Sequence, residues 1–259
     1  MKKSINLSLI ASSLLLLPHS ANAAEPIVIS SIDWCPQLCN SDAKPGYIMD
    51  TVKAIFKDSP YDIQVKTYPW TRAIKLVETG KSHALLAPAK GEAPNLVFPT
   101  QEVGLQRMCF FTKSNTDWQY TGAESLKGMK VGLAQDTTLE GLDDYIASNK
   151  SQFDFIPYSD EYLNTSIKKV KFNRIDTFVF TYNSTQYGIN ERQLSDEYRE
   201  AGCLPSSKVY MAFTPDAGKG ANVSKMITHF DKRMAELKSS GEIKKIMAKY
   251  GLNDWQDYL

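Results

Sequence analysis

The sequence predicts an α/β protein of two lobes, with two strands that cross between them. Strand patterns alternate along the chain with helical patterns, which is typical of parallel sheets covered by helices. The alternation is complete once by about residue 90 and starts again near residue 130, so we expect two α/β units. Strand-like apolar segments at 108–112 and 208–214 lie between and after the units, where they would cross from one to the other.

The first unit is expected to contain three strands and two helices. Residues 27–32 are β-branched and apolar, apolar residues recur at helical spacing through 48–56, and 63–67 alternates with the two-residue period of a strand. After Pro69 a second helical face ends near Gly80, a residue typical of helix C-termini, and 84–87 has the pattern of a short buried strand.

The second unit repeats this order after a polar stretch at 113–123. Strands are expected at 130–134, 153–157 and 175–180, one helix is expected to start at 136–138, and Ser159 is placed to cap a helix through Lys169. Helical patterns at 223–238 and 243–250 complete the chain.

Composition and charge exclude several classes of protein. The chain has 259 residues, 42% of them hydrophobic, and a formal net charge of +1 from 30 basic and 29 acidic side chains. This composition is that of a chain that buries an ordinary core rather than a disordered, collagenous or coiled-coil protein. Neither the balance nor any run of like charges favours nucleic acid or an anionic membrane as a partner.

The first residues have the pattern of a secretory signal peptide. A positive start is followed by a mostly apolar run over 5–17 and by small residues at 21–23. The run is shorter than the roughly 20 residues that a membrane-spanning helix needs. We therefore expect 1–23 to be a signal peptide, cleaved after Ala23, and the mature protein to be exported and not membrane-spanning.

Export bears on the four cysteines, because an oxidising compartment allows them to form disulfides. We expect Cys35 to pair with Cys39, which leaves Cys109 to pair with Cys203. Free buried thiols are the alternative for the second pair. A zinc half-site is the alternative for the first, but the mature chain offers only two histidines and neither lies in a ligand-spaced cluster. No metal or cofactor is expected.

Several short motifs follow one another in an order and spacing that are specific only when taken together. They are PGY at 45–47, PWTRA at 69–73, LVETGK at 76–81, FP at 98–99, VG at 103–104, LKGMKVG at 126–132, NRID at 173–176, GEI at 241–243 and KYG at 249–251. With these motifs nearly all of the mature chain resembles the type II periplasmic solute-binding proteins, in the family that includes the polar amino-acid binding proteins of ABC transporters.

This resemblance implies a periplasmic protein whose two lobes enclose a solute. It implies a first lobe of 24–112 plus 213–259, a second lobe of 113–212, two crossing strands that act as a hinge, and a ligand cleft between the lobes. Such a protein would be a monomer that captures a small polar solute, an amino acid or a related compound, and delivers it to an ABC permease.

The resemblance also implies candidate ligand contacts. Trp34 follows the first strand at the rim of the cleft, and Tyr47 and Trp70 stand at aromatic or first-turn contact positions. Packing of Trp34 on the Cys35 to Cys39 loop, and of Trp70 in the core, are the alternatives. Thr137 and Thr138 would hold a ligand carboxylate at a helix start, although Asp136 stands where the family usually has glycine and would repel an anion.

The two charged anchors for a free amino acid are displaced in this chain. The resemblance places Ala93 where the family has an arginine that pairs with the α-carboxylate, so Lys90 or Arg107 would have to substitute, unless each is simply solvated. It places Thr181 where the family has an aspartate that binds the α-ammonium group. A hydroxyl cannot replace that charge. We therefore expect a small polar or aromatic solute that need not be a standard amino acid.

Two other functions are compatible with the sequence. A ligand-sensing subunit for a membrane receptor would have the same fold. An enzyme, similar to the cyclic-acid dehydratases related to this fold, would need a tuned acid or base in the cleft. The candidates are Asp33, Glu92, Glu102, Asp136 and Glu140. Because the sequence has no nucleophile constellation and no glycine-rich phosphate loop, we expect a binding protein rather than an enzyme.

Overall fold

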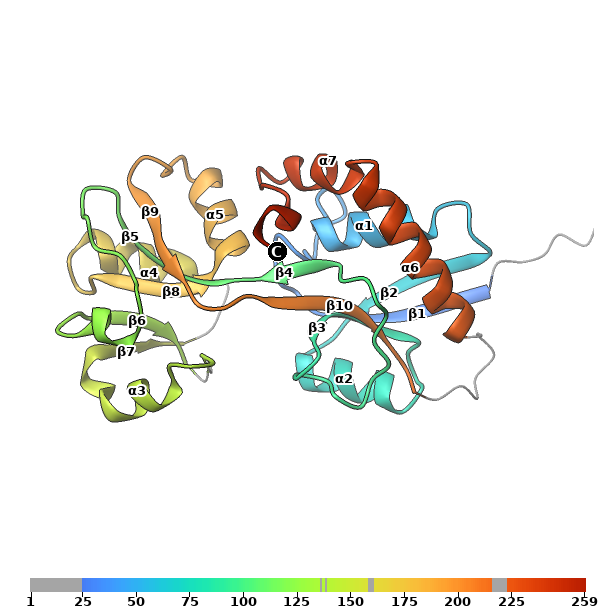
Figure 1. Cartoon of the computed structure of the whole chain (residues 1–259), viewed down its shortest axis with the longest axis horizontal. Helices are drawn as coiled ribbons and strands as arrows, with labels where there is room; N and C mark the ends of the chain where they lie inside the picture. Colours follow the sequence, from blue (N-terminus) through green and yellow to red (C-terminus); the bar gives the residue numbers. More distant parts are fainter. Residues whose placement is uncertain (1–24, 136, 138, 158–160, 216–222) are drawn as a thin grey trace, which may run out of the picture.

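The computed structural model describes residues 25–135, 137, 139–157, 161–215 and 223–259. Its two lobes lie side by side, and each contains a five-stranded mixed sheet with helices against it (Figure 1). The strand orders are β2-β1-β3-β10-β4 in the first sheet and β7-β6-β8-β5-β9 in the second. The expected two-lobed α/β architecture is confirmed. The expected signal peptide at 1–23 and the expected contact Thr138 lie outside the described residues.

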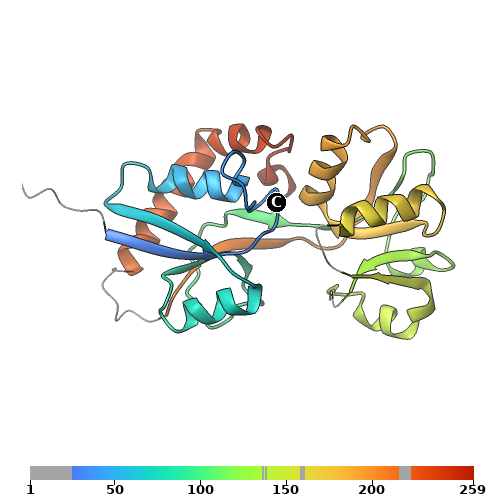
Figure 2. The same cartoon turned by 180° about the vertical axis from the view of Figure 1, so that it is seen from behind.

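The first lobe takes its strands and helices from both ends of the chain, as the view from behind also makes clear (Figure 2). The strands are β1 (Glu25–Ser31), β2 (Tyr61–Thr67), β3 (Ala84–Ala89), β4 (Gly104–Gln106) and β10 (Ser207–Phe213). The helices are α1 (Tyr47–Phe56), α2 (Trp70–Glu78), α6 (Val223–Ser239) and α7 (Glu242–Ala248), with a short 3-10 helix, η3 (Trp255–Tyr258), near the C-terminus.

Helices cover both faces of the first sheet, which explains why β3 is apolar throughout. Leu86 belongs to the cluster under α1, α6 and α7, whereas its neighbour Leu85 packs with Ala73 and Val77 of α2. Successive side chains of a strand point to opposite faces, so both must be apolar here. α2 ends where predicted, because Gly80 adopts a left-handed φ of 66° just after it.

The second lobe is built from the middle of the chain. Its strands are β5 (Met108–Lys113), β6 (Val131–Ala134), β7 (Phe153–Ile156), β8 (Thr177–Thr181) and β9 (Tyr198–Cys203), and its α-helices are α3 (Asp143–Ser148), α4 (Tyr162–Lys171) and α5 (Tyr182–Glu191). Two 3-10 turns, Ala123–Leu126 and Lys150–Gln152, complete it. Phe110 packs into the cluster under α3, and Phe111 into the one under α4 and α5.

Two segments cross between the lobes. β4 belongs to the first sheet and β5 to the second, so the chain first crosses at Arg107, the residue between them. β9 belongs to the second sheet and β10 to the first, so the chain crosses back at 204–206. The expected lobe boundaries fell a few residues later, at 112/113 and 212/213. Cys109 and Cys203 form a disulfide that joins the two segments at their second-lobe ends. The other expected disulfide, Cys35–Cys39, closes a short loop after β1.

On one side of the molecule α5 packs against the first lobe. Gln37 donates to the Ser184 hydroxyl (3.2 Å), which in turn donates to the carbonyl of Cys35 (2.9 Å). At the start of the same helix, Asn183 donates to the Tyr47 hydroxyl (3.2 Å). The loop closed by the Cys35–Cys39 disulfide is therefore a contact surface between the lobes.

Three elements were not predicted, and one helix starts later than expected. β4, with three residues, and β9 are edge strands. α5 is largely polar, because it buries only part of its surface against the first lobe. The helix expected from 136–138 begins at Asp143 instead. No helix in the described ranges is both long and apolar enough to span a membrane.

Candidate functional site

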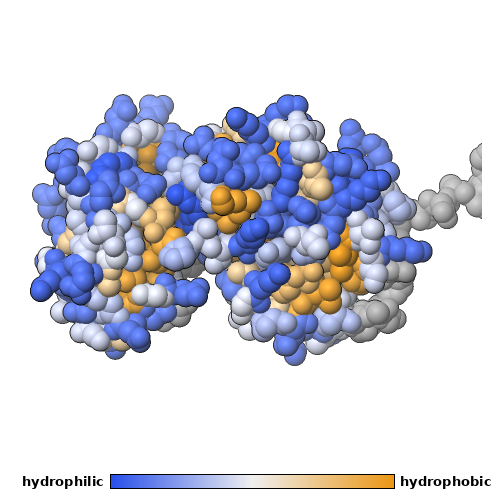
Figure 3. Space-filling view, in the orientation of Figure 1, coloured by the Kyte–Doolittle hydropathy of each residue, from blue (hydrophilic) through white to orange (hydrophobic). Residues whose placement is uncertain are grey.

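A cleft of about 490 Å³ opens between the lobes, where strands of both sheets end. In the first sheet, β1 leads into Ile32 and Trp34, and β3 into Glu92; in the second, β6 leads into Gln135 and Thr137. The space-filling view has a notch between the lobes on the side of α2 (Figure 3). In α/β sheets, ligand crevices form outside the carboxyl ends of parallel strands. The lining residues are Ile32, Trp34, Trp70, Ala87, Glu92, Gln106, Gln135 and Thr137.

Two half-buried tryptophans form the aromatic part of this cleft. Trp34 is held by reciprocal backbone hydrogen bonds with Leu38 (2.6 and 2.9 Å) across the disulfide loop. Trp70 is the first residue of α2 and packs with Ile32 against the apolar cluster on that side of the sheet. The Trp34 side chain packs against the main core cluster of the first lobe, and both indoles border the cleft. The core-packing interpretation of Trp70 is therefore borne out in part, since its ring both packs with the apolar cluster and borders the cleft.

Glu92 is the charged residue that the described lining contributes. Its Oε2 accepts a hydrogen bond from the backbone N–H of Ala89 (2.7 Å), in the turn that follows β3. Although the Glu92 side chain is exposed to solvent, the chain around its carboxylate partly desolvates it and raises its pKa, against the effect of this hydrogen bond, which lowers it. Among the described residues that line the cleft, none is lysine, arginine or histidine.

Trp34 also borders a second hollow of about 330 Å³, on the side of α4 and α5. Asp33 and Cys35 line it from the first lobe, and Tyr162, Phe180 and Ser184 are among its residues from the second. The space between the lobes therefore continues on both sides of the Trp34 ring.

The expected contacts Tyr47, Lys90, Arg107 and Thr181 are not among the lining residues of the cleft. Tyr47 is buried beneath the interface with α5, and burial, opposed by the hydrogen bond from Asn183, raises its pKa well above the usual range. Lys90 extends over the ring of Tyr210, with 5.2 Å between its ammonium nitrogen and the ring centroid. The sequence cannot distinguish a tyrosine at the start of a helix that is buried, as Tyr47 is, from one that faces a cleft.

Arg107 lies at the first crossing and is packed between two aromatic rings. Its guanidinium carbon is 4.4 Å from the ring centroid of Tyr182 in α5 and 4.0 Å from that of Tyr258 in η3. Nη2 is 3.3 Å from the sulfur of Cys203 and 3.9 Å from Oε2 of Glu200. These contacts engage the guanidinium at the crossing, between α5 and η3, and Arg107 does not line the cleft.

Thr181 ends β8 and stands at the N-terminus of α5. It is only 6% exposed, and its Oγ1 has no hydrogen-bond partner among the described residues. Met108 of β5 lies opposite it in the antiparallel register. The position anticipated for the family's aspartate is thus a buried hydroxyl beside the crossing strand.

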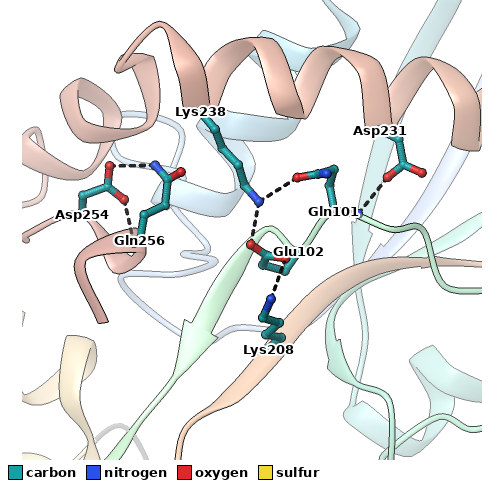
Figure 4. A network of polar contacts seen from close by, with 7 residues as sticks. All are labelled: Gln101, Glu102, Lys208, Asp231, Lys238, Asp254 and Gln256. Carbon is teal, nitrogen blue, oxygen red and sulfur yellow. Dashed lines mark hydrogen bonds and ion pairs between the residues drawn. The ribbon is translucent and has the colours of Figure 1, made fainter. Parts of the chain in front are cut away.

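Glu102, named as a possible acid or base, is instead buried in the first lobe and paired with two lysines. Its buried carboxylate accepts from Lys238 of α6 (2.5 Å) and pairs with Lys208 of β10 (3.5 Å), as Figure 4 shows. Burial, which alone would raise the pKa of Glu102, is outweighed by the Lys238 hydrogen bond and the two lysine charges, so that the pKa is lowered. Sequence reasoning missed two further lining residues, Gln106 and Gln135. Gln106 is the last residue of β4 and Gln135 directly follows β6, and this position at a strand end was the available signal.

The comparisons with known proteins agree with this architecture. No family model matches the sequence, and no curated protein matches it. Among solved structures, the unliganded open L-cystine solute receptor of Neisseria gonorrhoeae superposes with a TM-score of 0.66 at 13% identity, covering 90% of this chain and 96% of that one. The open substrate binding domain 2 of Lactococcus lactis GlnP gives 0.64 at 17% identity, with coverages of 87% and 95%.

A third similar structure belongs to a different kind of protein. It is a histidine kinase sensor domain described as similar to periplasmic binding proteins, with a TM-score of 0.61 at 17% identity and coverages of 88% and 97%. At such identities the likeness concerns the fold. The chain has the two-lobed fold of the type II periplasmic binding proteins.

Proposed function

Because the chain has the fold of the type II periplasmic binding proteins, we propose that it captures a small solute between its lobes. The observation that carries the proposal is the cleft, which takes lining residues from the strand ends of both lobes. A solute that touches both sets of residues stabilises the closed arrangement of the lobes, so that binding and closure are coupled. The hinge of this motion is formed by the two crossings, at 107 and 204–206.

We place the protein in the periplasm. The signal-peptide pattern of the first residues supports export, and two disulfides with no free cysteine in the described chain suit an oxidising compartment. The ligand contacts that the cleft supports are Trp34, Trp70 and Thr137, together with Glu92.

Delivery of the solute to an ABC permease is the leading proposal for the step after binding. The fold neighbours include a substrate binding domain of GlnP and an L-cystine solute receptor, which supports a transport role. The neighbouring histidine kinase sensor domain supports the second candidate, a ligand-sensing subunit that acts on a membrane receptor. No catalytic step is proposed, because Glu102 is engaged by lysines and the described cleft holds a single acid.

A binding experiment tests the proposal. The full chain is expressed, the exported protein is purified, and co-purified small molecules are sought by native mass spectrometry. A panel of amino acids, amines, organic acids and sugars is then screened by thermal shift, where a ligand at a hundredfold excess over its Kd adds about 2.7 kcal/mol of stability. We expect one class to raise the melting temperature and to reduce the radius of gyration in X-ray scattering. A screen without any hit, on protein freed of bound solute, would refute a solute-binding role.

Transport and sensing are separated in cells. Deletion of the gene should abolish high-affinity uptake of the radiolabelled solute if the protein serves a permease. Normal uptake, combined with loss of a transcriptional or behavioural response to the solute, would favour sensing.

A further inference from the structure

We infer that the solute bound in the interlobe cleft is a small organic cation without a carboxylate, such as an amine or a quaternary ammonium compound. The inference rests on the proposed function, because it concerns the ligand of the same cleft. It commits to a chemical class that the fold does not fix.

The charge of the lining favours a cation. Glu92 contributes a carboxylate whose Oε2 is held by the Ala89 N–H, and no basic side chain of the described chain lies within ion-pair distance of it. The other carboxylate oxygen is therefore available to a ligand. A cation that enters supplies the opposite charge to this carboxylate, which lies at the solvent-exposed edge of the cleft.

The two indoles of the lining, Trp34 and Trp70, also favour a cation. The face of an indole carries the negative end of the ring quadrupole and attracts ammonium and quaternary ammonium groups. Both rings already pack against apolar clusters of the first lobe, so little side-chain entropy is lost when a ligand binds. Two indoles and one carboxylate in one cleft match a cation with apolar substituents.

The basic side chains that were candidates for binding a carboxylate are engaged outside the lining of the cleft. Lys90 lies over Tyr210 and Arg107 between Tyr182 and Tyr258, and neither lines the cleft. The residue at the arginine position inferred from the family resemblance, Ala93, is buried in the core of the first lobe.

For a carboxylate, the described lining offers only neutral donors, namely the Thr137 hydroxyl and the side-chain amides of Gln106 and Gln135, beside the N-terminus of α2, which begins at Trp70. That terminus offers the equivalent of about half a positive charge, whereas Glu92 bears a full negative charge when ionised. The net field of the described lining therefore favours a cation over an anion. The cleft volume, about 490 Å³, is ample for a small organic molecule.

Matched pairs of ligands that differ by one carboxylate test this inference on the wild-type protein. The pairs are agmatine and arginine, cadaverine and lysine, tryptamine and tryptophan, and choline and glycine betaine. Affinities are measured by calorimetry on protein freed of bound solute. We expect at least one cation to bind about tenfold or more tightly than its carboxylated partner. Tighter binding of the carboxylated member, or of a neutral sugar, would overturn the inference and leave the solute-binding role intact; no binding by any solute would overturn both.

A variant pair assigns the selectivity to the carboxylate. Glu92→Gln keeps an acceptor for the Ala89 N–H and removes the charge, and is expected to weaken binding of the preferred cation by about 10- to 100-fold. The control is Glu78→Gln. Glu78 is the last residue of α2, and its carboxylate also accepts a hydrogen bond in the native protein, from Asn95 (3.0 Å). The control should bind within about twofold of wild type. Equal affinities for the two variants would refute the role of Glu92, and the ligand pairs decide the inference if either variant fails to fold.

Discussion

Replacement of Glu102 by glutamine should remove one of the strongest polar contacts of the first lobe. The carboxylate has a side-chain exposure of 5%, and Lys238, its closer partner, is only 16% exposed. Loss of a charge-assisted hydrogen bond costs about 1.5–3 kcal/mol, and leaving a buried charge without its partner costs about 3–5 kcal/mol. Lys238 would keep the Gln101 side-chain oxygen at 2.8 Å and the ring of Trp255. We therefore expect Glu102→Gln to lower the free energy of unfolding by about 2 kcal/mol.

The two lysines provide the matched comparison. Lys208 pairs with Glu102 across 3.5 Å but is 47% exposed, so Lys208→Met should cost less than about 1 kcal/mol. Lys238→Met leaves the buried carboxylate with this exposed partner alone and should cost about 3 kcal/mol. Urea unfolding at neutral pH, followed by circular dichroism, measures all three variants. Equal costs for Lys208→Met and Lys238→Met would refute the assignment of the stabilisation to the buried pair.

The same network makes stability depend on pH. Because the folded protein holds the pKa of Glu102 below its ordinary value of 4.5, the contribution is fully present above that pH and is lost as the pH falls through the folded-state pKa. The difference between wild type and Glu102→Gln should therefore be largest at neutral pH and shrink below about pH 4.5. A difference that stays constant down to about pH 3 would contradict the lowered pKa.

Three further predictions concern the loop after β1 and the crossings. Gly46 has a φ of 103°, and a Cβ there would lie 2.3 Å from the carbonyl oxygen of Gln37, so Gly46→Ala should cost about 2–4 kcal/mol in urea unfolding; a near-neutral variant would contradict the close approach. Cys109 and Cys203 are 94 residues apart, so replacing both by alanine should cost about 3–5 kcal/mol, checked by calorimetric unfolding against wild type with and without reductant. Arg107→Met should cost about 1–2 kcal/mol and Arg107→Lys a similar amount, because lysine lacks the planar group that stacks on both rings; full rescue by lysine would show that charge alone matters.

The space between the lobes differs on its two sides, with direct contacts at the α5 interface and an open volume at the cleft. On one side α5 is tied to the disulfide loop through Ser184, whereas on the other side Trp34 and Trp70 border an open volume. Polar contacts of α5 use short side chains and backbone carbonyls, which require close packing. The residues around the open volume are instead aromatic, amide and carboxylate groups at strand ends, which is the arrangement expected of a ligand site.

The periodicity of apolar residues and the positions of glycine and proline in the sequence determined most of the fold. The two-residue period of 63–67, the fully apolar run at 84–87 and the glycine after α2 are local properties that depend on backbone geometry and burial alone. The disulfide pairing also came from the sequence, because export and the short spacing of the first pair left one partner for each remaining cysteine. The candidate ligand contacts Trp34, Trp70 and Thr137 came from the family resemblance, and all three line the cleft.

Tertiary structure alone decided which polar and aromatic side chains face the cleft. Tyr47, Lys90 and Arg107 have residue types suited to ligand binding, but one is buried under α5 and two lie over tyrosine rings that are far away in the sequence. Glu92 and Glu102 are both acids near strands, and the difference between them is that two lysines from α6 and β10 approach only the second. Local pattern fixes backbone conformation, whereas the partner of a charge is set by the long-range packing of elements, which no short segment contains.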